Sequence, residues 1–156
     1  MDRKSLSAAI LGLAAAAILW LAIVSQAPSF GSFGIIRRDG SVVVADSDIV
    51  SYNASRHEMT LTAECAARLE ADRFLEGAFT VVVDGEVVLT GTFVPPIISR
   101  SYPPNEVLIT YPNFDLKYDV MKIQMGYPWT LPEAPVVEDS ALVAYFSSTG
   151  RLMPKI

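Results

Sequence analysis

The chain has 156 residues, of which 51% are hydrophobic and 19% charged, and its formal net charge is −5. This composition, with nine glycines and a single cysteine, excludes collagen-like, intrinsically disordered and disulfide-framework proteins. The acidic balance argues against a nucleic-acid partner, because phosphates require clustered lysine and arginine. The length predicts one domain with an added segment.

The hydrophobic excess is concentrated near the start, where Ser5 to Val24 reads SLSAAILGLAAAAILWLAIV. Twenty residues at 1.5 Å each make about 30 Å of helix, the thickness of the hydrocarbon core of a bilayer. We therefore expect residues 1–25 to form a transmembrane anchor. Arg3 and Lys4 abut the helix and predict the N-terminus inside and the following domain outside the cell membrane. Trp20 is then expected at the outer membrane interface.

Two other interpretations of the first residues stay open. A cleaved signal peptide would end at the small pair Ser25 and Ala27, but Pro28 would then follow the cut, and the apolar run is longer than a signal core. A prepilin-type leader cut near Ser5 would leave an apolar helix that drives filament assembly.

Residues 26–36 are rich in glycine, serine and proline and predict a flexible linker, in which Phe30 and Phe33 would contact lipid headgroups. The remaining residues, 37–156, keep 10 of the 12 basic and 16 of the 17 acidic side chains, a net charge of about −6. We expect them to form an extracytoplasmic domain that is soluble on its own.

Strand patterns come first in this domain, at 41–45, 48–52 and 57–61, and an amphipathic helix is expected over 63–73 with Thr62 as its N-cap. Asp84-Gly85 between two β-branched runs predicts a β-hairpin. Further strands are expected at 92–94, 106–110 and 120–125, and a last helix from Asp139 to about 148. The predicted fold class is α+β: a mostly antiparallel sheet with a helix packed on one face and a short C-terminal helix.

The block from His57 to Val94, with HEMTLT, ECAARLE and FTVVVDGEVV, resembles the extracytoplasmic head of SecD-type protein-export subunits. The similarity extends over about residues 48–111. It implies a similar head fold and contact with extended polypeptide. SecD-type proteins have several membrane spans and an intramembrane carboxylate, whereas this chain has one apolar run without charge. The resemblance therefore does not imply energy-driven export.

The side chains that carry chemistry are few. The chain has one histidine, His57, and one cysteine, Cys65, and we expect the first on a sheet face and the second in the core. We predict no catalytic constellation, metal site, cofactor or small-molecule substrate, and hence not an enzyme. Asn53-Ala-Ser55 is a glycosylation sequon, which is relevant only if the host glycosylates its exported proteins.

Aromatic residues beside prolines suggest a protein-contact surface, because tyrosine and tryptophan offer large amphipathic areas. The candidates are Tyr102, Tyr111, Phe114, Tyr127 and Trp129. The alternative is that these rings close the core while the prolines end strands. The sequence thus predicts a single-pass anchored domain that binds other membrane or exported proteins. The alternative is a pilin-like filament or surface-layer subunit that assembles through the apolar helix.

Overall fold

The computed structural model describes residues 32–154, except 73–74, 98–99, 114 and 128–136. The expected transmembrane anchor, with Trp20, lies outside these residues. Within the part that is described, no helix is both long and apolar enough to cross a membrane.

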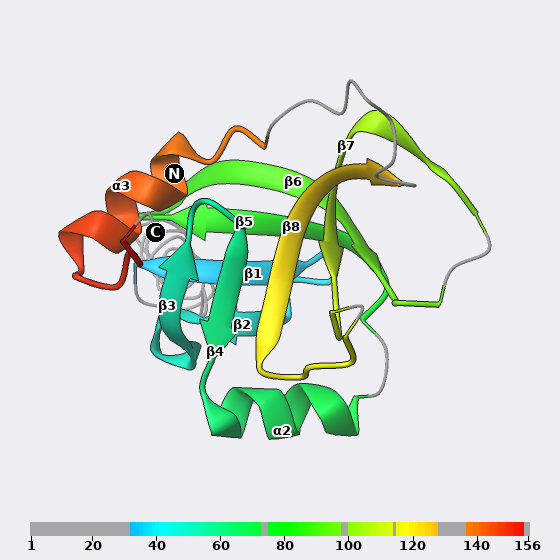
Figure 1. Ribbon diagram of the computed structural model, residues 1–156, viewed down its shortest axis with the longest axis horizontal. Helices are drawn as coiled ribbons and strands as arrows, with labels where there is room; N and C mark the ends of the chain where they lie inside the picture. Colours follow the sequence, from blue (N-terminus) through cyan, green and yellow to red (C-terminus); the bar gives the residue numbers. More distant parts are fainter. Residues whose placement is uncertain (1–31, 73–74, 98–99, 114, 128–136, 155–156) are drawn as a thin grey trace, which may run out of the picture.

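Eight strands form a single sheet, in the order β2-β1-β5-β6-β7-β8-β4-β3 (Figure 1). All neighbouring strands are antiparallel except β6 and β7, which are parallel. The strands are β1 Phe33–Arg37, β2 Val42–Ala45, β3 Ile49–Asn53, β4 Glu58–Leu61, β5 Gly77–Val83, β6 Glu86–Val94, β7 Tyr102–Thr110 and β8 Val120–Tyr127. Helix α2 spans Ala63–Ala71 and helix α3 spans Ser140–Ser148.

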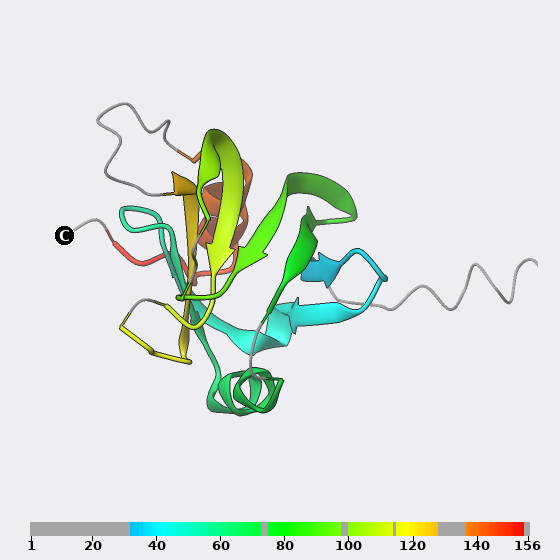
Figure 2. The same cartoon turned by 90° about the vertical axis from the view of Figure 1, so that its right-hand side faces the viewer.

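The sheet has to curl, because its two edge strands are almost consecutive in the chain. Strands β2 and β3 are joined only by a short 3-10 helix, Asp46–Asp48. That connection spans at most about 14 Å, whereas eight strands in a flat sheet would place the edges about 34 Å apart. Figure 2 shows the resulting curvature. The two edges therefore approach each other around a common interior.

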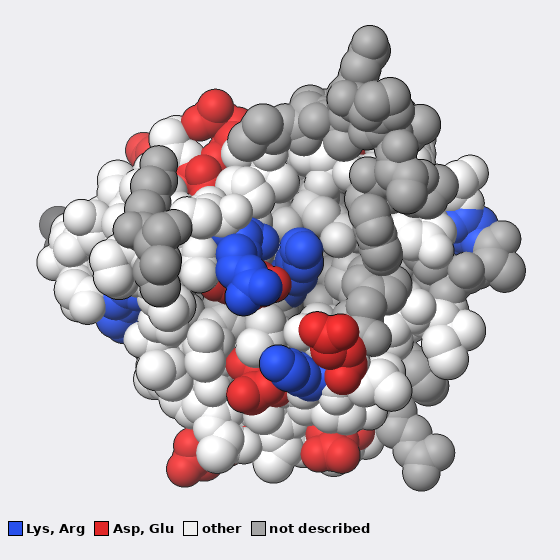
Figure 3. All heavy atoms as spheres, viewed as in Figure 1, with Lys and Arg blue, Asp and Glu red and all other residues white. Residues whose placement is uncertain are grey.

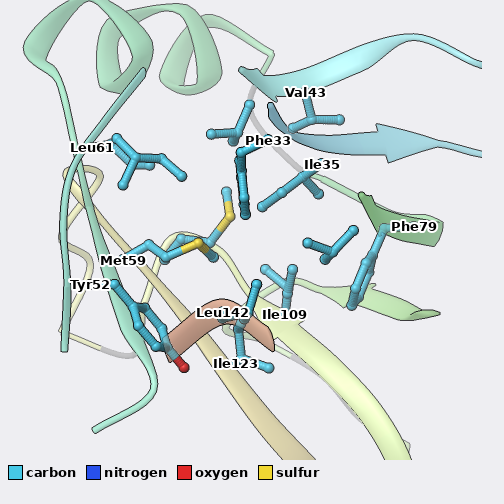
Figure 4. Close-up of a cluster of buried hydrophobic side chains, with 14 of the residues drawn as sticks. Phe33, Ile35, Val43, Tyr52, Met59, Leu61, Phe79, Ile109, Ile123 and Leu142 are labelled. Atoms are coloured by element: carbon cyan, nitrogen blue, oxygen red, sulfur yellow. The ribbon is translucent and has the colours of Figure 1, made fainter. Parts of the chain in front are cut away.

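The interior of this curl is the hydrophobic core (Figure 4). Strand residues such as Ile35, Met59 and Ile109 are 0% exposed and point into it from different parts of the sheet. Helix α2 buries only Cys65 and Leu69, and α3 adds its own buried set, Leu142, Tyr145 and Phe146.

The expected fold class is therefore wrong. The molecule is a curled, mixed sheet of eight strands with two helices at its margins, not a sheet whose face is covered by a packed helix. The sheet curls so that its own strands supply most of the core, and each nine-residue helix covers only part of it. Local sequence patterns indicate single helices and strands. They do not indicate which strands pair in parallel, as β6 and β7 do.

The expected linker also needs correction. Residues 33–36 belong to β1, which lies between β2 and β5 in the sheet. Phe33 is 1% and Ile35 0% exposed, so Phe33 packs in the core rather than against lipid. The glycines and serines around them resemble a spacer in composition, yet Gly34 pairs with Ala45 and Val82 as an ordinary strand residue.

Candidate functional site

A pocket of about 670 Å³ opens between the turn after β3, one face of α3 and the C-terminal segment. We call it the tail pocket, because the chain after α3 forms one of its walls. Its polar lining consists of His57, Asp139 and Ser147. Its other lining residues are Ala54, Val143, Gly150, Leu152, Met153 and Pro154. A mostly apolar pocket with a few convergent polar groups is the usual form of a ligand site.

His57 is held in place by the turn that joins β3 to β4. Asn53 Oδ1 accepts the backbone N–H groups of Ser55 at 3.0 Å and Arg56 at 3.2 Å. His57 itself has a φ of 52°, in the left-handed region, and its carbonyl accepts the N–H of Ile123 at 2.8 Å. The residue therefore lies in the turn before β4, and the expectation that it sits on a strand face is wrong.

Asp139 orients the imidazole. Its Oδ2 lies 3.0 Å from His57 Nδ1 and also accepts the hydroxyl of Tyr52. Burial and the bond to this carboxylate raise the pKa of Tyr52 far above its usual value, so that hydroxyl remains a donor. When the imidazole is neutral, Nδ1–H donates to Asp139 and Nε2 is left as an acceptor.

The sequence indicated Asp139 as the cap of the last helix. Asp139 does occupy the N-cap position of α3, but its side chain makes no capping bond. The carboxylate turns instead to Tyr52 and His57, which lie 87 and 82 residues away in the chain. No local pattern connects these three residues, and sequence reasoning missed the site for this reason.

A second polar network fixes the start of the C-terminal segment. Arg151 Nη2 lies 2.6 Å from Asp46 Oδ1, and Arg151 Nη1 donates to the Asp46 carbonyl at 2.8 Å. The Tyr145 hydroxyl donates to the same Asp46 oxygen at 2.5 Å and lies 2.8 Å from Ser32 Oγ. This network ties α3 and the C-terminal segment to residues at both ends of the β1–β2 hairpin.

The C-terminal segment then runs along β3 as an extended chain. Tyr52 N donates to the Arg151 carbonyl at 2.9 Å, and Met153 N donates to the Tyr52 carbonyl at 2.8 Å. Tyr52 and Leu152 thus form a parallel β-bridge. The wall of the tail pocket is consequently a short peptide segment that pairs with an edge strand.

The tail pocket presents one imidazole that is oriented by a carboxylate. Among the described residues, the side chains that hydrogen-bond the His57 ring are Tyr52 and Asp139, neither of which is placed as a nucleophile. Cys65 is 0% exposed, and burial raises the pKa of its thiol to about 11. The described residues also contain no group of three or more side chains that could hold a metal ion.

The three predicted aromatic contact residues that the structure describes do not form one surface. Tyr102 and Tyr127 pair across β7 and β8 and pack on a small cluster with Val94 and Leu108. Tyr111 is 1% exposed in the main core and donates its hydroxyl to the carbonyl of Tyr118. The two remaining candidates, Phe114 and Trp129, lie outside the described residues.

Asn53, the candidate glycosylation residue, is half-buried at the end of β3. Its side-chain oxygen is used to hold the turn. On the face shown in Figure 3, basic and acidic side chains are interspersed.

Comparison with known proteins adds no relative: no family model, no curated protein and no solved structure matches the chain.

Proposed function

We propose that the chain is a single-pass membrane-anchored protein whose extracytoplasmic domain binds extended segments of other membrane or exported proteins at the tail pocket. The observation that carries the proposal is the bridge between Tyr52 and Leu152. It shows an extended segment held by backbone hydrogen bonds on the edge strand β3, directly beside an open pocket.

Peptide recognition by strand addition works in this way. Backbone hydrogen bonds to an edge strand supply affinity, and a pocket for a side chain supplies selectivity. Here the bridge covers a single residue pair, and the pocket beside it has apolar walls from Val143, Leu152 and Met153. A partner segment would extend this short ladder or place an apolar side chain in the pocket.

The membrane part of the proposal rests on the uncharged run from Ser5 to Val24 and on the basic residues before it. The resemblance of residues 48–111 to the SecD-type head remains a prediction, and it adds the expectation of contact with polypeptide. Protease added to intact cells should digest the domain and leave a short membrane stub. Full protection until lysis would contradict the orientation.

Site-specific photo-crosslinking in intact cells tests the binding site. A photoreactive residue at Met153, in the pocket wall, should give crosslinks to partner proteins. The same residue at Val87, which is 61% exposed beside the β5–β6 turn, should give none and serves as the control. Equal crosslinking at both positions, or none at Met153, would overturn the assignment of the tail pocket as the contact site.

The filament alternative uses the same apolar helix, and the mass of the mature N-terminus separates the two. A chain that retains Arg3 and Lys4 supports the anchor. A chain that has lost the residues before Ser5 supports assembly through the helix instead.

A further inference from the structure

The guanidinium of Arg151 occupies a site that matches its shape and charge. Nη2 lies 2.6 Å from Asp46 Oδ1 and 3.2 Å from the Tyr145 hydroxyl. Nη1 donates to the carbonyls of Asp46 at 2.8 Å and Ile49 at 3.3 Å. The guanidinium carbon lies 5.5 Å from the centroid of the Tyr145 ring and 5.4 Å from that of Phe146. A carboxylate, two carbonyls and two aromatic rings together favour arginine over lysine.

The residues around Arg151 are held as an extended strand on the edge of β3. The Arg151 carbonyl accepts the Tyr52 N–H at 2.9 Å, and Met153 N donates to the Tyr52 carbonyl at 2.8 Å. The side chain of Leu152, between these two bonds, packs against the main core. Residues 151–153 therefore show how an arginine followed by a large apolar residue binds to this edge, in a direction parallel to β3.

The contacts that hold this segment are ones that another chain can make. Gly150, with a φ of 71°, ends the turn after α3 and separates the segment from the helix. The backbone bonds that join the segment to α3 run from the N–H groups of Arg151 and Leu152 to the Phe146 carbonyl, at 2.8 and 3.0 Å. A short segment joined in this way can open locally while the sheet stays folded.

From these observations we propose that the Asp46–Tyr145 site and the β3 edge recognise an arginine followed by a large apolar residue in an extended segment of a partner protein. Residues 151–153 occupy the site within the same chain until the partner segment displaces them. The net charge of −5 favours the approach of a basic segment. The inference rests on the proposed function, because the edge of β3 at Tyr52 is the contact surface in both.

A peptide copy of the segment tests the site. Full-length protein in phosphatidylcholine nanodiscs is titrated with a fluorescent peptide of residues 149–156, TGRLMPKI, while the anisotropy is recorded. Arg151→Ala vacates the site, so this variant should bind the peptide at least about tenfold tighter than the wild type, in which the tethered arginine competes. The matched control Arg56→Ala removes an exposed arginine of the β3–β4 turn and should bind as the wild type does.

Substitution in the peptide tests the chemistry. Arg151→Lys in the peptide should weaken its binding to the Arg151→Ala protein at least about tenfold, because an ammonium lacks the planar fork that faces Asp46 and the two rings. A folded Arg151→Ala protein that binds no tighter than the wild type, or that binds both peptides equally, would overturn the proposal.

A second protein variant covers the case in which Arg151→Ala fails to fold. Arg151→Lys in the protein retains a cation beside Asp46 but loses the planar contact, so it should bind the arginine peptide at least about threefold tighter than the wild type. Binding equal to that of the wild type would again overturn the proposal.

The other possible occupant is the same segment of a second copy of the chain, and light scattering of the wild type in detergent tests it. A monomer supports a partner protein as the occupant. A dimer that Arg151→Ala dissociates would assign the site to a second copy and overturn the partner.

The crosslinking experiment decides the proposed function separately. After displacement Met153 stays within three residues of Gly150, about 11 Å at most, so it still reports contact at this edge. Crosslinks at Met153 without any preference for the arginine peptide would support the proposed function and overturn the arginine site. The arginine preference without crosslinks would support the site and overturn the proposed function.

Discussion

At the scale of single residues, Tyr52 connects the core, the sheet edge and the pocket. The residue is 0% exposed, its ring packs 5.2 Å from that of Phe146, and its backbone holds the C-terminal segment. Its hydroxyl reaches Asp139. A single side chain therefore couples the packing of the interior to the geometry of the only imidazole.

Removing this hydroxyl tests the coupling. We expect Tyr52→Phe to lower the free energy of unfolding by about 1–2 kcal/mol, because a partly buried carboxylate loses one of its two donors. The apolar packing is retained, so the loss isolates the hydrogen bond. Urea unfolding of the two proteins measures it.

Tyr118→Phe is the matched control, since no hydrogen bond of the described residues uses the Tyr118 hydroxyl, and only its carbonyl accepts Tyr111. That variant should unfold within about 0.5 kcal/mol of the wild type. Similar losses in both variants would show that the Tyr52–Asp139 bond contributes nothing specific.

Cys65 should be unreactive while the chain is folded. Burial foremost, and the negative charge of Asp48, raise the pKa of its thiol above its ordinary value, to about 11. Between these values the unfolded thiol ionises while the folded thiol does not, so the thiol lowers stability as pH rises through this window. Iodoacetamide at about pH 8 should label the chain only after denaturation, because the thiolate is the reactive form. Rapid stoichiometric labelling of the folded protein would contradict the burial.

At the scale of elements, the β5–β6 hairpin is the feature that the sequence predicts best. Asp84 and Gly85 have φ values of 51° and 84°, the two positive angles that a type I′ turn requires. These angles confirm the prediction. The turn could be predicted because it depends on two adjacent residues. No local sequence pattern predicts the close approach of β6 to β7. Gly91 makes this approach possible because it has no Cβ to meet the Val107 carbonyl.

Two glycines of β6 and its turn permit a matched comparison. A Cβ at Gly85 would meet no atom within 4 Å, so Gly85→Ala should cost only backbone strain, about 1 kcal/mol. A Cβ at Gly91 would lie 2.0 Å from the Val107 carbonyl oxygen. Gly91→Ala must therefore move β7 away from β6, and we expect a loss of about 3 kcal/mol or more.

Urea unfolding of both glycine variants measures the difference, with Asp84→Asn as a near-neutral control because asparagine tolerates positive φ well. Gly91→Ala as mild as Gly85→Ala would show that β6 and β7 do not approach as closely as the structure indicates.

Single elements were predictable where the pattern is local. Helix α2 begins after Thr62, whose hydroxyl accepts the Cys65 N–H as expected of a cap, and the alternation of Met59 and Leu61 marks β4. Strand β1 was missed because FGIIR follows a spacer-like composition and is too short to show a period. His57 was misplaced because one turn residue with a positive φ cannot be told from the start of a strand.

At the scale of the whole molecule, both edges of the sheet are partly covered. Arg68 donates to the Val43 carbonyl of β2 at 3.2 Å and is itself held by Asp48 at 2.7 Å. The C-terminal segment covers part of β3. Partial covering of the edges limits uncontrolled pairing between copies. The order of strands and the meeting of His57 with Asp139 arise only at this scale, and a single sequence contains no signal for either.

The position of β1 changes where the domain can be cut. The sequence indicated that residues 37–156 would fold alone, but that fragment lacks Phe33 to Ile36 and therefore most of a strand in the interior of the sheet. Without it, β2 and β5 lose their shared partner, and Phe33 and Ile35 no longer fill the core.

We therefore expect a fragment that starts at residue 29 to be soluble and to unfold in one cooperative transition, whereas a fragment that starts at residue 37 aggregates or unfolds without cooperativity. The two fragments differ by eight residues, and the longer one also keeps Ser32, which hydrogen-bonds Tyr145 and accepts the Asp84 N–H through its carbonyl. Circular dichroism followed through urea unfolding measures both. Equal, cooperative unfolding of the two fragments would show that β1 is dispensable. The domain would then begin at residue 37, as the sequence predicted, and not at β1.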